Sequence, residues 1–164
     1  MFGWSSAVLR AALILTIVLL ANPAAAEFIC LKIERPLKQA ITIPASVGEE
    51  LRLSFRHSIY GSQVEEQFRI TEEGLETTEL RYSEARLVEF YGYEGARFER
   101  GWWIVEGKHQ IIPFLDLRVS PESLLQIFLG SEPIFLSPMV DPGGLVRLTV
   151  IPCERTIDGR RADN

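Results

Sequence analysis

The sequence predicts an all-β protein, a single-domain antiparallel β-sandwich or open barrel. About nine short apolar or alternating segments follow one another between Phe28 and Ile151, which is the pattern of half-buried strands. Glycine- or proline-bearing turns separate them about every 8–12 residues. No internal repeat, low-complexity segment or linker divides the chain, so one domain accounts for it.

The first 26 residues are predicted to be a cleavable secretory signal peptide. Arg10 is their only charged residue, the apolar run Ala11–Ala21 follows it, and Ala24–Ala26 supplies an A-x-A cleavage site. An uncleaved membrane anchor is the less favoured alternative, because this run is shorter than the about 20 residues that span a bilayer. We therefore expect residues 27–164 to form one β domain in the periplasm or another extracytoplasmic space, with a disordered tail over about 155–164.

Composition excludes several kinds of partner. The net charge is −5 and no basic block is present, which argues against nucleic-acid binding and gives no reason to expect binding to anionic lipid. Association with a membrane is therefore expected only through a partner.

The two cysteines lie at opposite ends of the predicted domain. Cys30 is in the first strand-like segment and Cys153 follows the last. In an oxidising compartment such a pair predicts a disulfide that joins the terminal strands, and two free buried thiols are the alternative.

The strands follow from local pattern. The first is apolar and stops before Pro36, and the segment near Ile111 is broken by Pro113. The predicted strands outside the two hairpins discussed below are Phe28–Ile33, Ile41–Ile43, Leu75–Tyr82, Leu87–Tyr91, Trp102–Val105, Ile111–Val119 and Leu145–Ile151.

A hairpin is predicted between Leu51 and Thr71. Apolar residues occupy odd positions before Gly61-Ser62 and even positions after it, as a two-residue hairpin loop requires. That loop would bring three apolar pairs into register, namely Leu53 with Ile70, Phe55 with Phe68 and Ile59 with Val64.

The segment from Ser120 to Ser137 allows two interpretations. Ser120-Pro121-Glu122 resembles a helix start and Gly130 a helix end. Alternatively, Leu124–Leu129 and Pro133–Leu136 form a hairpin around Gly130-Ser131. The hairpin is favoured, and the helix remains open.

His57 and Glu66 are the candidate functional pair. In the predicted register they face each other on the inward side of the hairpin, where both strands interrupt their apolar pattern. Cross-strand partners lie about 5 Å apart, within hydrogen-bond reach. The pair could brace the hairpin, or it could bind a ligand or partner group together with the neighbouring Ser58, and a different register would separate it.

Other site chemistries find little support. Ser58 would point to the opposite face, across from Glu65, because neighbouring strand residues alternate, so a Ser58–His57–Glu66 triad lacks attack geometry. The two histidines, His57 and His109, have no metal-ligand spacing, and no nucleotide-binding motif is present. We therefore expect no catalytic residue, metal or cofactor.

The segment Leu51–Ile59 followed by Val64-Glu65-Glu66 resembles a bacterial family of small exported proteins. The family carries a domain of unknown function and is often encoded beside TAXI-type TRAP transporters. His57, Ser58, Ile59 and Glu66 match its motif, a strand ending in His-Ser with an acidic residue nine positions after the histidine. Leu117–Val119, Leu129-Gly130 and Val146–Val150 are similar to its closing strands, whereas Arg86–Gly107 matches poorly.

The resemblance implies a transporter-associated periplasmic protein and implies no activity. The first hypothesis is thus a non-enzymatic accessory or binding protein linked to TRAP-type (TAXI) uptake, with a transporter component or a small molecule as partner. A small hydrolase that uses His57 and Glu66 as an acid–base pair and a structural envelope module are the alternatives.

Overall fold

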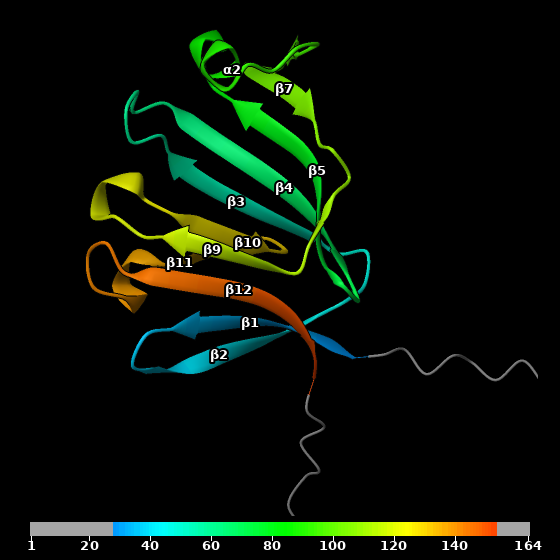
Figure 1. Ribbon diagram of the computed structural model, residues 1–164, viewed down its shortest axis with the longest axis vertical. Coiled ribbons are helices and arrows are strands. Elements are labelled where there is room, and N and C mark those ends of the chain that lie inside the picture. Colours follow the sequence, from blue (N-terminus) through cyan, green and yellow to red (C-terminus); the bar gives the residue numbers. More distant parts are fainter. Residues whose placement is uncertain (1–27, 154–164) are drawn as a thin grey trace, which may run out of the picture.

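The chain folds into two antiparallel sheets that face each other and do not close into a barrel (Figure 1). This computed structural model describes residues 28–153, and the predicted all-β sandwich is confirmed. The predicted signal peptide and the tail over about 155–164 lie outside the described residues. Between residues 28 and 153, no helix is long and apolar enough to cross a membrane.

The smaller sheet has four strands and the larger has eight. In spatial order, the smaller sheet consists of β2 (Lys38–Ala45), β1 (Ile29–Arg35), β12 (Leu145–Pro152) and β9 (Phe114–Arg118). The larger sheet consists of β11 (Glu132–Phe135), β10 (Gln126–Leu129), β3 (Glu50–Arg56), β4 (Gln63–Thr71), β5 (Gly74–Tyr82), β7 (Trp102–Glu106) and β6 (Arg97–Glu99), with β8 (Ile111–Ile112) paired to β5.

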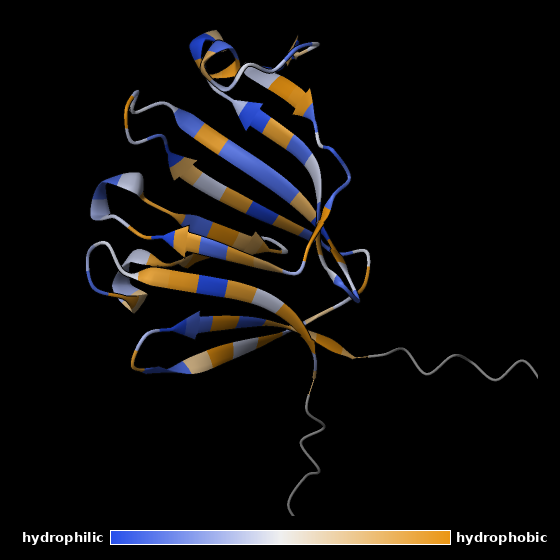
Figure 2. Ribbon diagram, viewed as in Figure 1, coloured by the Kyte–Doolittle hydropathy of each residue, from blue (hydrophilic) through white to orange (hydrophobic). Residues whose placement is uncertain are grey.

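The main core lies between the sheets and follows the period-two pattern of the strands, visible as alternating bands in Figure 2. β1 contributes Leu31 and Ile33, and β12 contributes Val146 and Leu148. The facing sheet contributes Leu51, Leu53, Phe68, Ile70, Leu75 and Ile127.

The disulfide prediction is confirmed. Cys30 and Cys153 are bonded, with Cα atoms 5.1 Å apart. They join the start of β1 to the residue after β12, and these strands are neighbours in the smaller sheet. A disulfide fits a chain that folds outside the cytoplasm.

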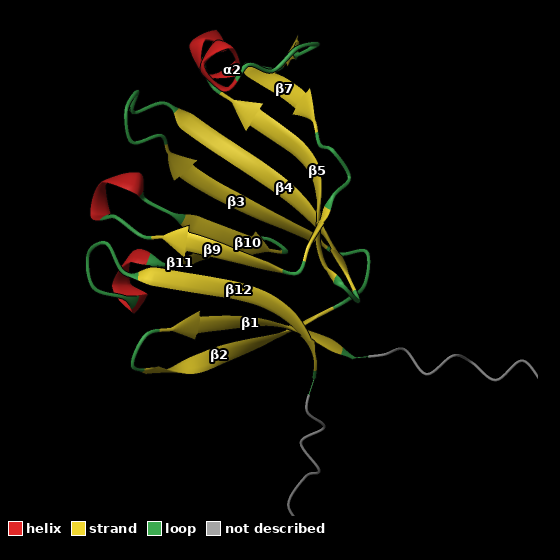
Figure 3. Cartoon of the chain, viewed as in Figure 1, coloured by secondary structure: helices red, strands yellow, loops and turns green. Residues whose placement is uncertain are grey.

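A second, smaller core lies at the other end of the larger sheet. The helix α2 (Ala85–Tyr91) lies at this end of the sheet (Figure 3). Its Leu87 and Val88 pack against Val64 and Tyr82. The inner face of the larger sheet is thus covered at one end by the smaller sheet and at the other by α2. The face between the two cores remains open, and the candidate site lies there.

The predicted strand at Leu87–Tyr91 is wrong, because this segment is the helix α2. Leu87 and Tyr91 lie four residues apart, which places them on one face of a helix. Gly92 ends the helix at φ 67°, the left-handed conformation that glycine adopts without strain.

The favoured hairpin at Leu124–Leu136 is confirmed, since β10 and β11 pair around Gly130. The residues that resemble a helix start, Ser120-Pro121-Glu122, belong to a short 3₁₀ turn. Ser120 caps a single 3₁₀ turn at Pro121–Ser123, accepting a hydrogen bond from the backbone of Ser123. The turn ends there and the chain continues into the hairpin.

The hairpin of β3 and β4 exists, but its predicted register is wrong. Leu53 lies opposite Glu66 and not Ile70, and Phe55 lies opposite Val64 and not Phe68. The connection is longer than two residues and runs from His57 to Ser62. The His57 N–H donates to the carbonyl oxygen of Ser62, and the Gly61 N–H donates to that of His57. The shift is even, so the predicted inward faces are retained.

Candidate functional site

An open cleft lies between the two sheets, at the gap between the two cores. It has two chambers, of about 450 Å³ and about 280 Å³. Glu66 of β4 and Leu115 of β9 line both chambers. The larger chamber alone falls within the ~300–1,000 Å³ typical of small-molecule sites.

The larger chamber has an apolar floor and a charged rim. Its floor is formed by Phe68, Leu80, Val105 and residues of β8 and β9. The rim carries the carboxylates of Glu94 and Glu106 and the single cation Lys108. Counted with Glu66, carboxylates outnumber cations in this chamber, which favours a ligand with a positively charged group.

The smaller chamber is more apolar. Leu53, Phe55, Leu117 and Leu125 line it, together with Glu66 and Leu115. Its polar residues beyond Glu66 are Arg118 and Ser123. A ligand held at Glu66 could therefore extend an apolar part into this chamber.

Glu66 is the group that connects the chambers. It lies opposite Leu53 on one side and Leu80 on the other, and desolvation by burial raises the pKa of its carboxyl. Within residues 28–153 no hydrogen bond or ion pair to its side chain is recorded. A half-buried carboxyl without a partner among these residues can accept one from a ligand.

Three tyrosines adjoin Glu66. The rings of Tyr82, Tyr91 and Tyr93 contact one another with centroids 5.7–6.0 Å apart. Burial raises the pKa of Tyr82 far above its usual range, the neighbouring Tyr93 and the charge of Glu66 adding to the effect. Burial and the charge of Glu66 also raise the pKa of Tyr91, so the phenols of Tyr82 and Tyr91 stay neutral and can donate hydrogen bonds.

His57 does not pair with Glu66, contrary to the predicted register. It follows β3, is 7% exposed and packs its ring against Tyr60, Phe90 and Tyr91 at centroid distances of 5.3–5.8 Å. The backbone N–H groups of Ile59 and Tyr60 donate to its Nδ1 at 3.3 and 3.4 Å. These contacts brace the turn, and Tyr91, whose ring contacts that of His57, is also influenced by the charge of Glu66.

Substitution of His57 by Phe is expected to lower the free energy of unfolding by about 1 kcal/mol, because two turn N–H groups lose their acceptor while the ring contacts remain. His57→Asn is the matched variant, since its amide oxygen can still accept while the ring is lost. Urea unfolding of both proteins checks this expectation. Equal stability of His57→Phe and wild type would contradict the bracing role.

Ionic and polar contacts fix the same turn to α2. Ser62 donates to Glu84 at 2.6 Å, and this hydrogen bond, aided by Arg86, lowers the pKa of the Glu84 carboxyl. Arg86 also donates to the carbonyl oxygen of Tyr60 and stacks on its ring, 4.7 Å from the centroid. Ser58, in contrast, is exposed in the turn and is absent from the residues that line the two chambers.

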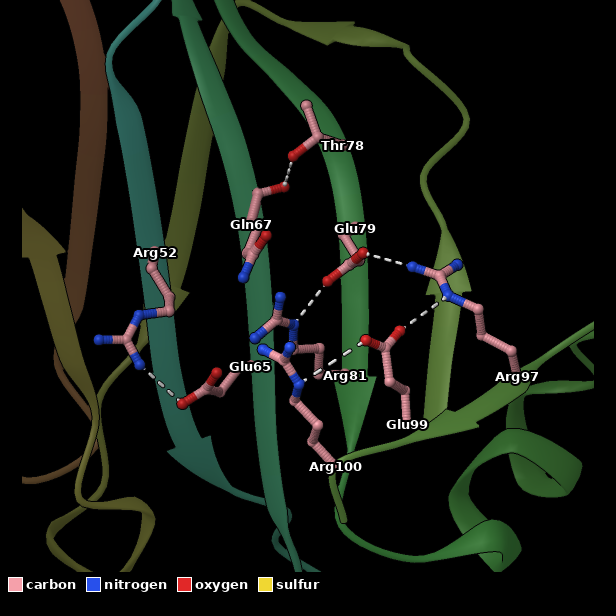
Figure 4. A network of polar contacts seen from close by, with 9 residues as sticks. All are labelled: Arg52, Glu65, Gln67, Thr78, Glu79, Arg81, Arg97, Glu99 and Arg100. Carbon is pink, nitrogen blue, oxygen red and sulfur yellow. Dashed lines mark hydrogen bonds and ion pairs between the residues drawn. The ribbon is translucent and has the colours of Figure 1, made fainter. Parts of the chain in front are cut away.

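Glu65, which precedes Glu66 in the chain, lies on the outer face of the larger sheet and differs from Glu66 in having an ion-pair partner. Glu65 points away from the cleft and pairs with Arg52 at 2.8 Å. It adjoins a cluster in which Glu79 pairs with Arg81 and Arg97 (Figure 4). The outer carboxylates thus have arginine partners, whereas Glu66 on the inner face has none among the described residues.

The remaining cleft residues come from segments that carry no local motif. Tyr93, Glu94 and Lys108 lie in loops, and Leu115 comes from the other sheet. Within residues 28–153 no group of three or more His, Cys, Asp or Glu could hold a metal ion.

Comparisons with known proteins agree with the resemblance at the family level. The model of a domain of unknown function, DUF1850, matches residues 51–136. No curated protein and no solved structure matches the chain significantly. The matched segment contains Glu66, His57 and most of both chambers, and the chain belongs to the DUF1850 family.

Proposed function

We propose that this chain is an exported accessory or binding protein associated with TRAP-type (TAXI) solute transport, and that it binds its ligand at Glu66 in the cleft between the sheets. The ligand carries a positively charged or hydrogen-bond-donating group for Glu66 and an apolar part for the adjoining chambers. A single observation carries the binding role, namely that Glu66 lines both chambers and has no partner among the described residues.

Physical chemistry supports a cationic group on the ligand. A carboxylate loses hydration when it is buried, and an ammonium or guanidinium group that pairs with it offsets that loss. Glu94 and Glu106 at the rim add negative potential on the path to Glu66. The apolar floor contributes by burying the rest of the ligand.

The link to transport rests on the resemblance to small exported proteins encoded beside TAXI-type TRAP transporters. The disulfide between Cys30 and Cys153 is consistent with an extracytoplasmic location. The described residues 28–153 form one two-sheet domain, and the role proposed for it is an accessory one beside the transporter's own receptor.

The hydrolase alternative depended on a His57–Glu66 acid–base pair. Because Glu66 lies opposite Leu53 and His57 braces a turn, no such pair supports it. The envelope-module alternative predicts a cleft without ligand affinity, and the following experiment separates it from the proposal.

Octylammonium is expected to bind the protein and octanoate is not, as measured by isothermal titration calorimetry. Glu66→Gln is expected to weaken octylammonium binding about tenfold or more, because one charged partner of a buried pair is lost. Glu94→Gln is the matched control, since it removes one carboxylate from the exposed rim, and it should change affinity much less. Equal affinity of wild type and Glu66→Gln would contradict the assignment of the site.

The transport association needs its own experiment. Crosslinking of the tagged protein in its native envelope is expected to recover a TRAP permease or its receptor. Recovery of no transporter component would count against the association and would leave the binding role of Glu66 to the titration.

A further inference from the structure

The smaller sheet ends at β9, and the free edge of β9 borders the cleft. β9 pairs with β12 along one side, and no strand pairs with its other side among residues 28–153. Leu115 of β9 lines both chambers, and Leu117 and Arg118 line the smaller one. The unpaired backbone groups of this edge are therefore beside the ligand cleft.

The strands at the other sheet edges carry features that hinder strand addition, and β8, which pairs only with β5, has only two residues. β6 has only three residues, Pro133 lies within β11, and β2 contains Lys38 and Pro44. Short length, proline and lysine are the usual protection of edge strands. β9 has five residues, Phe-Leu-Asp-Leu-Arg, with neither proline nor lysine, so it is the edge most open to pairing.

The smaller sheet is also narrower than the larger sheet, and an added strand would reduce this difference in width. The larger sheet continues through β5 and β7 past the point where the smaller sheet stops. A strand added to β9 would lie about 4.8 Å farther along the smaller sheet. It would cover the inner-face residues Phe68, Leu80 and Val105, which line the larger chamber.

Charge complementarity specifies the residue at the centre of such a strand. Its inward side chains, two residues apart, would enter the cleft. Apolar side chains suit the floor, and a lysine or arginine suits Glu66 with Glu94 and Glu106 at the rim.

We propose that the occupant of the cleft is an extended segment of a partner polypeptide, which pairs with β9 as a fifth strand of the smaller sheet. Its inward-facing residues are apolar on either side of a central lysine or arginine. Backbone hydrogen bonds to β9 supply affinity and the central cation supplies specificity, as in other cases of strand addition. This inference rests on the proposed binding role of Glu66 and names the class of ligand.

The test uses the purified protein and the peptide acetyl-Thr-Val-Thr-Lys-Thr-Val-Thr-amide, which presents Val, Lys and Val on one side. Amide NMR shifts are expected to concentrate on β9 and on Glu66. Replacement of the central Lys by Glu, or Glu66→Gln in the protein, is expected to weaken binding about tenfold or more. Glu73→Gln is the control, because it removes an exposed carboxylate of the turn between β4 and β5 that lines neither chamber.

Two N-methylated peptides test the backbone pairing. One carries N-methyl groups on the Val and Lys residues, and the other carries them on the second and third Thr. A strand directs alternate N–H groups to opposite edges, so one peptide is expected to lose binding and the other to keep it. Equal binding by both peptides, or shifts confined to β6 or β11, would overturn the inference.

Octylammonium distinguishes this inference from the proposed function. Binding of octylammonium without binding of the peptide would overturn strand addition and leave the Glu66 site supported. Absence of both would overturn the two together.

Discussion

Reduction of the Cys30–Cys153 disulfide is expected to lower the free energy of unfolding by about 4–5 kcal/mol. The bond closes a loop with a sequence separation of 123 residues, which encloses almost the whole described chain. Its loss would release the conformational freedom of the unfolded state, while β1 and β12 remain paired over six residues in the folded state. Urea unfolding with and without a thiol reductant measures the difference.

The double variant Cys30→Ala/Cys153→Ala is the control for this experiment. It should be about as unstable as the reduced wild type, apart from the packing lost at Cys30, which is 4% exposed, and the reductant should not affect it further. An unchanged urea midpoint on reduction of the wild type would show that the bond contributes little. Because the cleft lies away from the β1–β12 seam, octylammonium affinity should persist under reducing conditions in which the fold survives.

Sequence pattern predicted the faces of the strands better than their pairing. Alternation correctly assigned Leu53, Phe55 and Glu66 to the inner face. It could not determine register, because a shift by an even number of residues leaves every side chain on the same face. The two-residue turn was inferred from Gly61-Ser62, whereas the actual turn depends on His57 and on the contact of Ser62 with α2, and these are tertiary interactions.

The prediction of a strand at Leu87–Tyr91 was wrong for a similar reason. Leu87–Tyr91 is short and apolar, and short apolar runs do not distinguish a strand from a buried helix. Its helical form depends on the second core, where Leu87 and Val88 pack against Val64 and Tyr82. The sequence did not predict the cleft either, because the cleft results from the difference in width between the two sheets, which is a property of the tertiary structure. Glu66 alone gave a usable signal, an ionisable residue at an inward position of an apolar pattern.

Replacement of Glu66 by Leu is expected to stabilise the protein by about 1 kcal/mol near neutral pH, the low end of the cost of burying a polar group without a partner, because the carboxyl is half-buried. Its raised pKa gives this effect a definite pH dependence. Below the unfolded value, near 4.5, the carboxyl is neutral in both states and costs little. As the pH rises from the unfolded pKa through the folded pKa, ionisation of Glu66 lowers the free energy of unfolding of the wild type. Glu66→Leu has no carboxyl at this position and shows no such loss.

The difference in stability between the two proteins is the quantity to follow, because Glu84 and Asp116 have lowered pKa values and give the opposite slope in both. Urea unfolding from pH 4 to pH 8 should therefore show a gap that opens with rising pH. Glu94→Gln, at the exposed rim of the same cleft, should show no comparable gap. A bound cation at Glu66 would stabilise the ionised carboxyl and close the gap, so octylammonium at high pH should narrow it for wild type alone. A gap that stays constant with pH would mean that Glu66 affects stability through packing and not through its charge. A pH-dependent gap that octylammonium leaves unchanged would contradict cation binding at Glu66.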